Sequence, residues 1–103
     1  MRILFATCSA QEADALVETL LEERLIGCAN VVPGMRSHYG WEGEVCHDEE
    51  VPLFMETVDE KASSARRRLR ELHSYDVPKS LLLDPADCDP DYQAWLMETP
   101  GPR

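Results

Sequence analysis

Residues 36–55 restrict the fold more than any other stretch, because they alternate in polarity on both sides of a turn. Neighbouring residues of an extended strand point to opposite faces: Ser37, Tyr39 and Trp41 share one face, and Arg36, His38 and Glu42 share the other. Glu42-Gly43 can supply the positive φ angles of a tight turn, which predicts one long β-hairpin. The arms are too long for a small domain. The hairpin is therefore either an ordinary central one, or its aromatic end overhangs and pairs with another subunit.

Strand and helix signals alternate along the rest of the chain. We expect strands at 3–6, 28–32 continuing through 35–41, 44–57 and 79–83, with Pro33-Gly34 interrupting the second. Capping boxes at 9–12 and 57–60 predict the first two helices, and Asp89-Pro90-Asp91 opens a short third helix. We expect the first helix to end near Gly27 in a left-handed conformation. Pro52 cannot donate an N–H, which predicts a bulge or a sheet edge there.

The order β-α-β-β-α-β plus a short C-terminal helix predicts an α+β fold, the ferredoxin-like split βαβ sandwich with a four-stranded antiparallel sheet. A length of 103 residues predicts a single domain, residues 1–103, with a frayed tail at 99–103. The two longer helices would cover one face of the sheet. The other face would expose large side chains such as Phe5, Tyr39, Trp41 and Phe54, which oligomerisation would cover.

The charge balance limits the partners. The chain has 20 acidic and 10 basic residues, a net charge of −10, which repels nucleic acid and anionic membranes. The acidic surface either attracts cations or serves solubility. No apolar run approaches the ~20 residues that span a bilayer. The chain starts directly with a strand pattern, without a leader pattern, which favours the cytoplasm.

Thiols and imidazoles are the candidate metal ligands. The cysteines at 8, 28, 46 and 88 form no C-x-x-C pair, so we expect free thiols. Cys28 lies where the apolar face of the first helix is expected to meet the second strand. It is interpreted as a buried structural thiol. Cys8 ends a strand just before a helix N-terminus, which favours an exposed thiolate. His73 could ligate metal, titrate, or cap the last carbonyls of the second helix, and the cap is the favoured interpretation.

Other motifs are absent or incomplete. Residues 87–98 carry acids at calcium-loop spacing, but Tyr92 occupies the position that requires glycine. Asp48-Glu49-Glu50 is interpreted as a solvated face. The sequence has no nucleophile elbow and no glycine-rich phosphate loop, so no enzymatic activity is predicted.

Four separate motifs in order resemble the CutA family, the divalent-cation-tolerance proteins. They are residues 23–34 (ERLIGCANVVPG), 39–43 (YGWEG), 72–78 (LHSYDVP) and 89–96 (DPDYQAWL). The resemblance implies a cytoplasmic homotrimer with a ferredoxin-like fold, in which long hairpins pair between subunits. The implied architecture is similar to that of the trimeric PII signalling proteins. It also implies tolerance of divalent metals, copper above all, with no enzymatic reaction and no required cofactor.

The resemblance also assigns residues. It implies intersubunit or assembly roles for Tyr39, Trp41, Glu42, Gly43, Tyr75, Asp76 and Pro78, and it nominates Cys8 and His73 as metal ligands. The chain departs from the family pattern at Gly40, Pro52, Glu56 and Ser74, of which Glu56 replaces a lysine and Ser74 a proline. The leading hypothesis is a homotrimeric protein that binds or responds to copper or another divalent metal. The alternative is a PII-like regulator that binds a small molecule in the intersubunit cleft.

Overall fold

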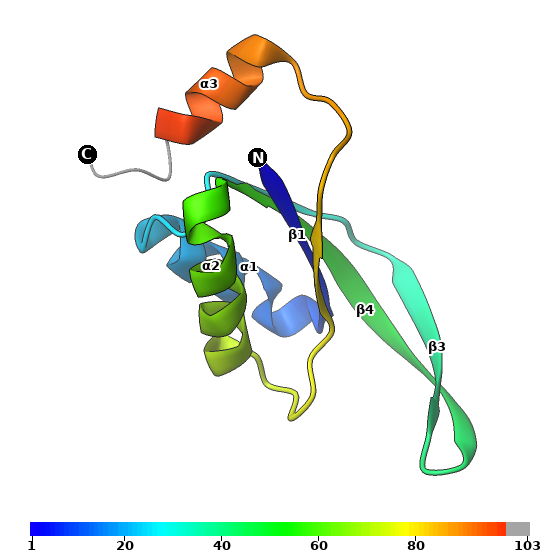
Figure 1. Ribbon diagram of the computed structural model, residues 1–103. Coiled ribbons are helices and arrows are strands. Elements are labelled where there is room, and N and C mark those ends of the chain that lie inside the picture. Colours follow the sequence, from blue (N-terminus) through cyan, green and yellow to red (C-terminus); the bar gives the residue numbers. More distant parts are fainter. Residues whose placement is uncertain (99–103) are drawn as a thin grey trace.

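The computed structural model describes residues 1–98 and confirms the predicted order of elements (Figure 1). The strands are β1 (Arg2–Cys8), β2 (Cys28–Val31), β3 (Met35–Trp41), β4 (Glu44–Thr57) and β5 (Ser80–Leu83), and the helices are α1 (Ala10–Glu22), α2 (Asp59–Leu72) and α3 (Pro90–Glu98). The sheet has five strands rather than four, because the break at Pro33-Gly34 divides the expected second strand into β2 and β3. The tail expected to fray, 99–103, lies outside the described residues.

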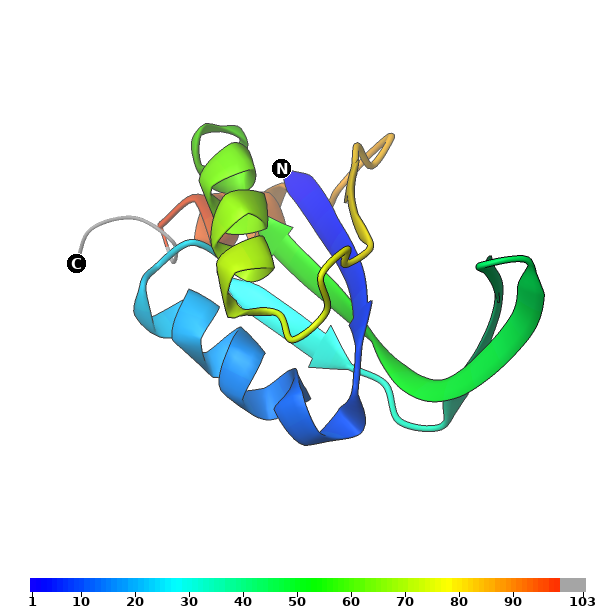
Figure 2. The same ribbon diagram turned by 90° about the horizontal axis from the view of Figure 1, so that it is seen from below.

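The antiparallel sheet is built around β4. The strand order is β2-β4-β1-β5, and β3 pairs with β4 beyond that body. The second half of β4 lies between β1 and β2, whereas residues Glu44 to Glu50 pair with β3. The β3–β4 hairpin therefore projects away from the body and curls, as Figures 1 and 2 show.

The hydrophobic core lies between the sheet and the two longer helices, which cover the same face (Figure 2). Leu4 and Ala6 of β1 and Leu53 and Met55 of β4 are fully buried there, since alternate strand residues share a face. The buried stripe predicted for α2 is confirmed at Ala62, Ala65 and Leu69, while Leu72 is half-buried against the core.

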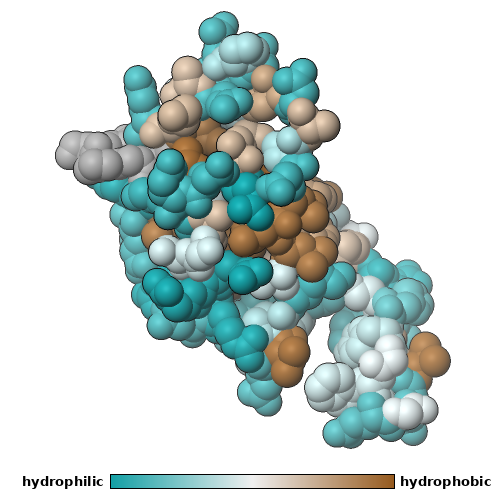
Figure 3. Space-filling view, viewed as in Figure 1, coloured by the Kyte–Doolittle hydropathy of each residue, from teal (hydrophilic) through white to brown (hydrophobic). Residues whose placement is uncertain are grey.

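The opposite face of the sheet is partly covered. Leu96 of α3 is buried, and the Tyr92 hydroxyl donates a hydrogen bond to the Glu56 carboxylate on β4. Beyond α3, Phe54 and the β5 residues Leu81 and Leu83 remain exposed. Figure 3 shows an apolar patch over β5, beside the projecting hairpin. The expected open apolar face is therefore present.

Two helix boundaries differ from the sequence prediction. Helix α1 ends at Glu22, and Arg24 takes the left-handed conformation with φ 61°, so the expected role of Gly27 is wrong. Gly27 instead donates its N–H to the Glu56 carbonyl at 2.9 Å. Thr57 does not cap α2, because its hydroxyl donates to the Leu25 carbonyl at 2.6 Å and α2 begins at Asp59.

Pro52 lies in the central strand β4, so the predicted sheet edge is wrong. The alternative prediction, a bulge, applies to the segment between β2 and β3 that lies opposite Pro52. Three residues, Val32 to Gly34, face only Val51 and Pro52, which places an extra residue opposite the proline. The Val32 N–H donates to the Pro52 carbonyl at 3.3 Å. In an antiparallel sheet, the N–H and the C=O of one residue point toward the same neighbouring strand. Because the Pro52 carbonyl points toward the bulge, the N–H that proline lacks would also have pointed there, and the pairing of β4 with β1 loses no hydrogen bond.

Candidate functional site

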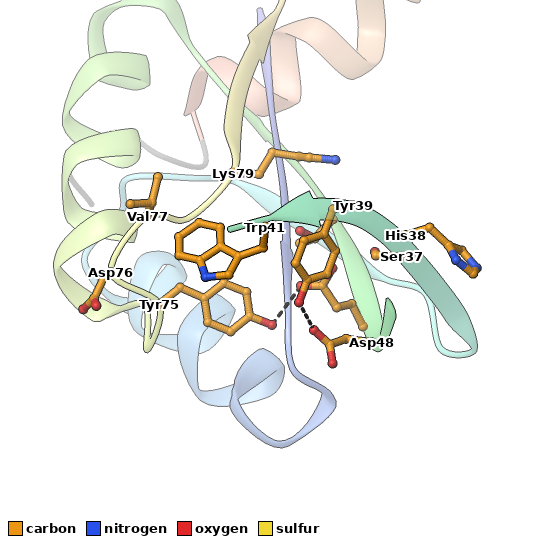
Figure 4. Close-up of a pocket in the computed structure, with 11 residues that line it drawn as sticks. Ser37, His38, Tyr39, Trp41, Asp48, Tyr75, Asp76, Val77 and Lys79 are labelled. Atoms are coloured by element: carbon orange, nitrogen blue, oxygen red, sulfur yellow. Dashed lines mark hydrogen bonds between the residues drawn. The ribbon is translucent and has the colours of Figure 1, made fainter. Parts of the chain in front are cut away.

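An acidic, aromatic cavity lies between the hairpin and the segment that follows α2. Its volume is about 540 Å³. The lining residues are Thr7, Ser37, His38, Tyr39, Trp41, Asp48, Glu50, Tyr75, Asp76, Val77 and Lys79. Figure 4 shows Trp41 and Tyr39 of the hairpin and Tyr75 of the segment after α2 on the walls of this cavity. The cavity thus combines three aromatic rings with three carboxylates and one lysine.

Strand alternation places these side chains. Tyr39 and Trp41 share a face of the hairpin with Asp48 and Glu50 of the paired strand. This face continues into the open face of the sheet, so the cavity and the apolar patch over β5 adjoin. The segment after α2 supplies the other wall, including Tyr75 and Lys79.

Two tyrosines bind two of the carboxylates. The Tyr75 hydroxyl donates to Glu50 at 2.8 Å, and the Tyr39 hydroxyl donates to Asp48, as the dashed lines in Figure 4 mark. The hydrogen bond to Asp48, and then partial desolvation, raise the pKa of Tyr39 to about 12. Burial, and then the hydrogen bond to Glu50, raise the pKa of Tyr75 well above its usual value. Both hydroxyls therefore stay protonated at neutral pH and act as donors.

His73 is buried at the inner end of this wall and is fully hydrogen-bonded. Its Nε2 lies 2.8 Å from the Thr7 carbonyl, and its Nδ1 accepts the Tyr75 N–H at 3.1 Å. Because Nδ1 is an acceptor, Nε2 carries the proton and donates to Thr7. His73 is the C-cap residue of α2, as the favoured interpretation has it, but its backbone N–H makes the bond to the Leu69 carbonyl at 2.9 Å and its side chain does not cap the helix. The ring joins the end of β1 to the segment after α2 instead.

Cys8 is buried and not the exposed thiolate that the sequence predicts. It shares the core face with Leu4 and Ala6, because strand alternation outweighs its position before α1. Burial, and then the charges of Glu12 and Glu50, raise the pKa of the Cys8 thiol to about 11. The metal role of Cys8 and His73 stays a prediction. Among residues 1–98, no three His, Cys, Asp or Glu side chains are grouped to hold a metal ion.

The other candidate residues lie in three different places. Tyr39, Trp41, Tyr75 and Asp76 meet at the cavity, with Pro78 between two lining residues. Glu42 and Gly43 form the exposed hairpin turn, with φ 49° and 82°. Cys28 is half-buried, opposite Glu56 on the face that α3 covers, so its expected place in the core is wrong.

The departures from the family pattern have structural consequences. Glu56 accepts the Tyr92 hydrogen bond beneath α3 and does not line the cavity. The Ser74 N–H donates to Glu12 at 3.0 Å and its hydroxyl donates at 2.8 Å. A proline at this position could make neither bond. Gly40 lies in β3 opposite Val45, where it leaves the outer face of the hairpin open.

Sequence reasoning missed Glu50 as a site residue. It is 8% exposed, although the acidic run that contains it was interpreted as a solvated face. Tyr75, 25 positions later, covers it, and no local signal predicts that contact. A weaker signal existed in the alternation of β4, which places Glu50 on the same face as Pro52 and Phe54.

The fold and the cavity define a class of protein: a ferredoxin-like α+β domain with a projecting hairpin and an acidic, aromatic cavity at its base. Comparison with known proteins identifies the family. The model of the CutA1 divalent ion tolerance protein family matches residues 2–99. The chain belongs to the CutA1 family.

Individual relatives agree in sequence and in structure. The divalent-cation tolerance protein CutA of Thermus thermophilus is 36% identical over 99 residues, 96% of each chain, and its solved structure gives a TM-score of 0.92 over 98% of this chain and all of that one. The CutA protein of Pyrococcus horikoshii is 41% identical over 88 residues, 85% of each chain. A structure described as the PII-like protein CutA from Nostoc, in apo form, is 25% identical and gives a TM-score of 0.92 over 98% of each chain. These matches confirm the family and the fold.

One structural exclusion concerns membranes. Within residues 1–98, none of the helices combines the length and the apolar character needed to cross a bilayer.

Proposed function

We propose that this chain is a homotrimeric divalent-metal tolerance protein of the cytoplasm, which binds or responds to copper and catalyses no reaction. Membership of the CutA1 divalent ion tolerance family is the observation that supports a role in metal tolerance. The four cysteines, all free thiols, fit a reducing compartment. The high pKa values of Tyr39 and Tyr75 fit a binding cavity better than acid–base catalysis, which works best with groups that titrate near neutral pH.

The trimer is supported by the surfaces that one chain leaves uncovered. Trp41, at the end of β3, is 57% exposed, and the patch with Phe54 and Leu81 lies nearby on the open sheet face. Among the strands of residues 1–98, β3 pairs with β4 alone, so its outer edge has N–H and C=O groups that another strand can use. Light scattering of the purified protein is expected to give three times the chain mass of 11.7 kDa. A monomer would contradict the proposed assembly.

The proposed copper ligands are Cys8 and His73. A metal ion bound by these two residues would displace the thiol proton of Cys8 and would break one of the two hydrogen bonds of the His73 ring. Titration of Cu(I) and Cu(II) into the purified trimer tests the assignment. Cys8→Ser and His73→Ala should each weaken binding, whereas Cys88→Ser, a half-buried thiol near Met1, serves as the matched control. Unchanged binding in both test variants would remove these residues as ligands.

A PII-like regulator is the second candidate, and the cavity is the observation that favours it. A volume of about 540 Å³ is in the range of small-molecule sites. Asp48, Glu50 and Asp76 outnumber Lys79, and aromatic rings attract cations, so the favoured ligand is a small organic cation. A thermal-shift screen of amines, nucleotides and metabolites tests this candidate. A ligand at 100 times its Kd adds about 2.7 kcal/mol of stability, so a screen with no stabilising compound argues against it.

A further inference from the structure

Two histidines face each other across the projecting hairpin. His38 of β3 and His47 of β4 are directly paired, and their ring centres lie 5.7 Å apart with an interplanar angle of 39°. Both side chains are exposed. They occupy the face of the hairpin opposite Tyr39 and Trp41, and Figure 4 shows the His38 ring pointing away from those two rings.

Although His38 is among the residues that line the cavity, its ring points away from those of Tyr39 and Trp41 and takes no part in the hydrogen bonds there. Within residues 1–98, no hydrogen bond or ion pair engages His38 or His47, and the contact between the two rings is their one aromatic contact. In contrast, His73, the third histidine, has both ring nitrogens hydrogen-bonded in the interior. The hairpin pair is therefore free to coordinate a ligand.

We propose that His38 and His47 together chelate one divalent transition-metal ion, with copper, zinc and nickel as the chemical class. Imidazole nitrogen is a favoured ligand for these ions. At a metal–nitrogen distance of about 2.1 Å, each ring centre lies about 3.2 Å from the metal, so two rings at a tetrahedral angle have centres about 5.2 Å apart. The observed 5.7 Å is close enough for small side-chain rotations to complete the chelate.

The backbone of the hairpin fixes this arrangement before metal binds. The pairing of β3 with β4 is regular from Met35↔Glu50 to Trp41↔Glu44, and the turn at Glu42 and Gly43 sets it. A chelating pair held in register loses less conformational freedom on binding than two mobile side chains. Solvent can fill the remaining coordination positions, since both rings are exposed.

The surrounding charges permit a cation. The adjacent pair on the same face is Arg36 and Glu49, whose charges oppose each other. The net charge of −10 over the whole chain favours the approach of cations. This site shares no residue with the proposed Cys8 and His73 pair, so it goes beyond the proposed function and can fail or stand separately.

Cu(II) binding to the full chain tests the proposal. Isothermal titration gives the affinity and stoichiometry, and electron paramagnetic resonance reports nitrogen ligands. We expect His38→Gln and His47→Gln each to lower the affinity at least ~10-fold, because either change converts a chelate into a single contact. The double variant should lose less affinity than the sum of the two single losses, because the two rings act as one chelating unit. Glu44→Gln, an exposed carboxylate on the opposite face of the hairpin, is the matched control and should keep both the affinity and the resonance signal of the hairpin site.

The outcomes separate the two metal assignments. Equal Cu(II) affinity and an unchanged nitrogen signal in His38→Gln and His47→Gln would overturn the chelate, as would independent, additive losses from the two changes. Circular dichroism and the assembled mass confirm that these exposed substitutions leave the fold intact. If Cys8→Ser and His73→Ala alone abolish binding, the proposed function stands and the hairpin site fails; the reverse result supports the hairpin site alone.

Discussion

Hydroxyl donors determine the character of the cavity at the scale of single side chains. Tyr39 and Tyr75 each donate to a carboxylate, Asp48 and Glu50, and so satisfy one oxygen while leaving the negative charge in place. Glu50 is 8% exposed, and none of the ion pairs within residues 1–98 involves it, so its carboxylate depends on the Tyr75 hydrogen bond. The cavity therefore remains an environment for cations.

Cys8 gives a prediction at the same scale. The thiolate is the reactive form, and both burial and the neighbouring acids keep the thiol of Cys8 protonated, with a pKa of about 11. At about pH 8, iodoacetamide should alkylate the half-buried Cys28, Cys46 and Cys88 at least ~10 times faster than Cys8. Peptide mass spectrometry over time measures the rates. Denatured protein, in which all four should react alike, is the control, and rapid labelling of native Cys8 would contradict the structure.

Among the elements, the hairpin depends on its turn. Glu42 and Gly43 both have positive φ, which matches the two-residue turn whose twist suits paired strands. Gly43→Ala places a side chain at φ 82° and should destabilise the protein by about 1 kcal/mol. Gly40→Ala is the control, because an added Cβ there would meet Glu44 O at an ordinary 4.0 Å. Urea unfolding of both variants checks the difference; equal stabilities would mean that the turn conformation is not required.

Helix α1 is joined to the segment after α2 by Glu12. Burial alone would raise the pKa of Glu12, but hydrogen bonds from Ser74 and Ser9 outweigh it and lower the pKa below its usual value. A lowered carboxyl pKa contributes stability above the unfolded value of about 4.3, and this contribution is lost as the pH falls through the folded pKa. Ser74 therefore makes the fold more stable at neutral pH than in acid.

The Ser74→Ala variant tests this link. It keeps the backbone N–H bond and removes the hydroxyl bond, so the Glu12 pKa should rise and the variant should lose less stability than the parent between about pH 7 and pH 3. Urea midpoints at the two pH values, with carboxyl titration by nuclear magnetic resonance, measure both effects. Ser63→Ala, an exposed site on α2, is the control. An identical loss of stability in parent and variant would refute the role of the bond.

At the scale of the whole molecule, the apolar patch and the net charge of −10 act in opposite directions. Like charges on identical chains repel, whereas burial of the exposed face of β5 favours association. Association therefore requires enough apolar area at the contact to outweigh this repulsion, and Figure 3 shows an apolar patch of this kind over β5.

Leu81→Asp provides the corresponding prediction. Leu81 is 46% exposed on the open face, so a charge there should disturb the single chain little but should dissociate the proposed trimer, raising its dissociation constant at least ~10-fold. Val45→Asp is the matched control, since Val45 is 85% exposed on the outer face of the hairpin. Analytical ultracentrifugation at several concentrations gives the assembled mass. Dissociation by Val45→Asp but not by Leu81→Asp would place the interface elsewhere.

The sequence predicted local features correctly wherever no distant residue offered the same group another hydrogen-bond partner. The alternation around Tyr39 and Trp41, and the turn at Glu42-Gly43, are confirmed because neighbouring strand residues must point to opposite faces. The capping box at Thr57 is wrong because a distant carbonyl, that of Leu25, takes its hydroxyl. Local motifs give way where a tertiary hydrogen bond offers the same group a buried partner.

Periodicity and turn chemistry alone determined the order of elements, the two faces of the hairpin and the open apolar surface of this protein. The tertiary structure decided which of the acids are buried, that Cys8 and His73 lie inside the fold with no grouped third ligand among residues 1–98, and that the segment after α2 closes the cavity. The physical reason is one of range. Strand faces follow from adjacent residues, whereas the environment of a charged or ligating side chain depends on groups that folding brings from far along the chain, as Tyr75 is brought to Glu50.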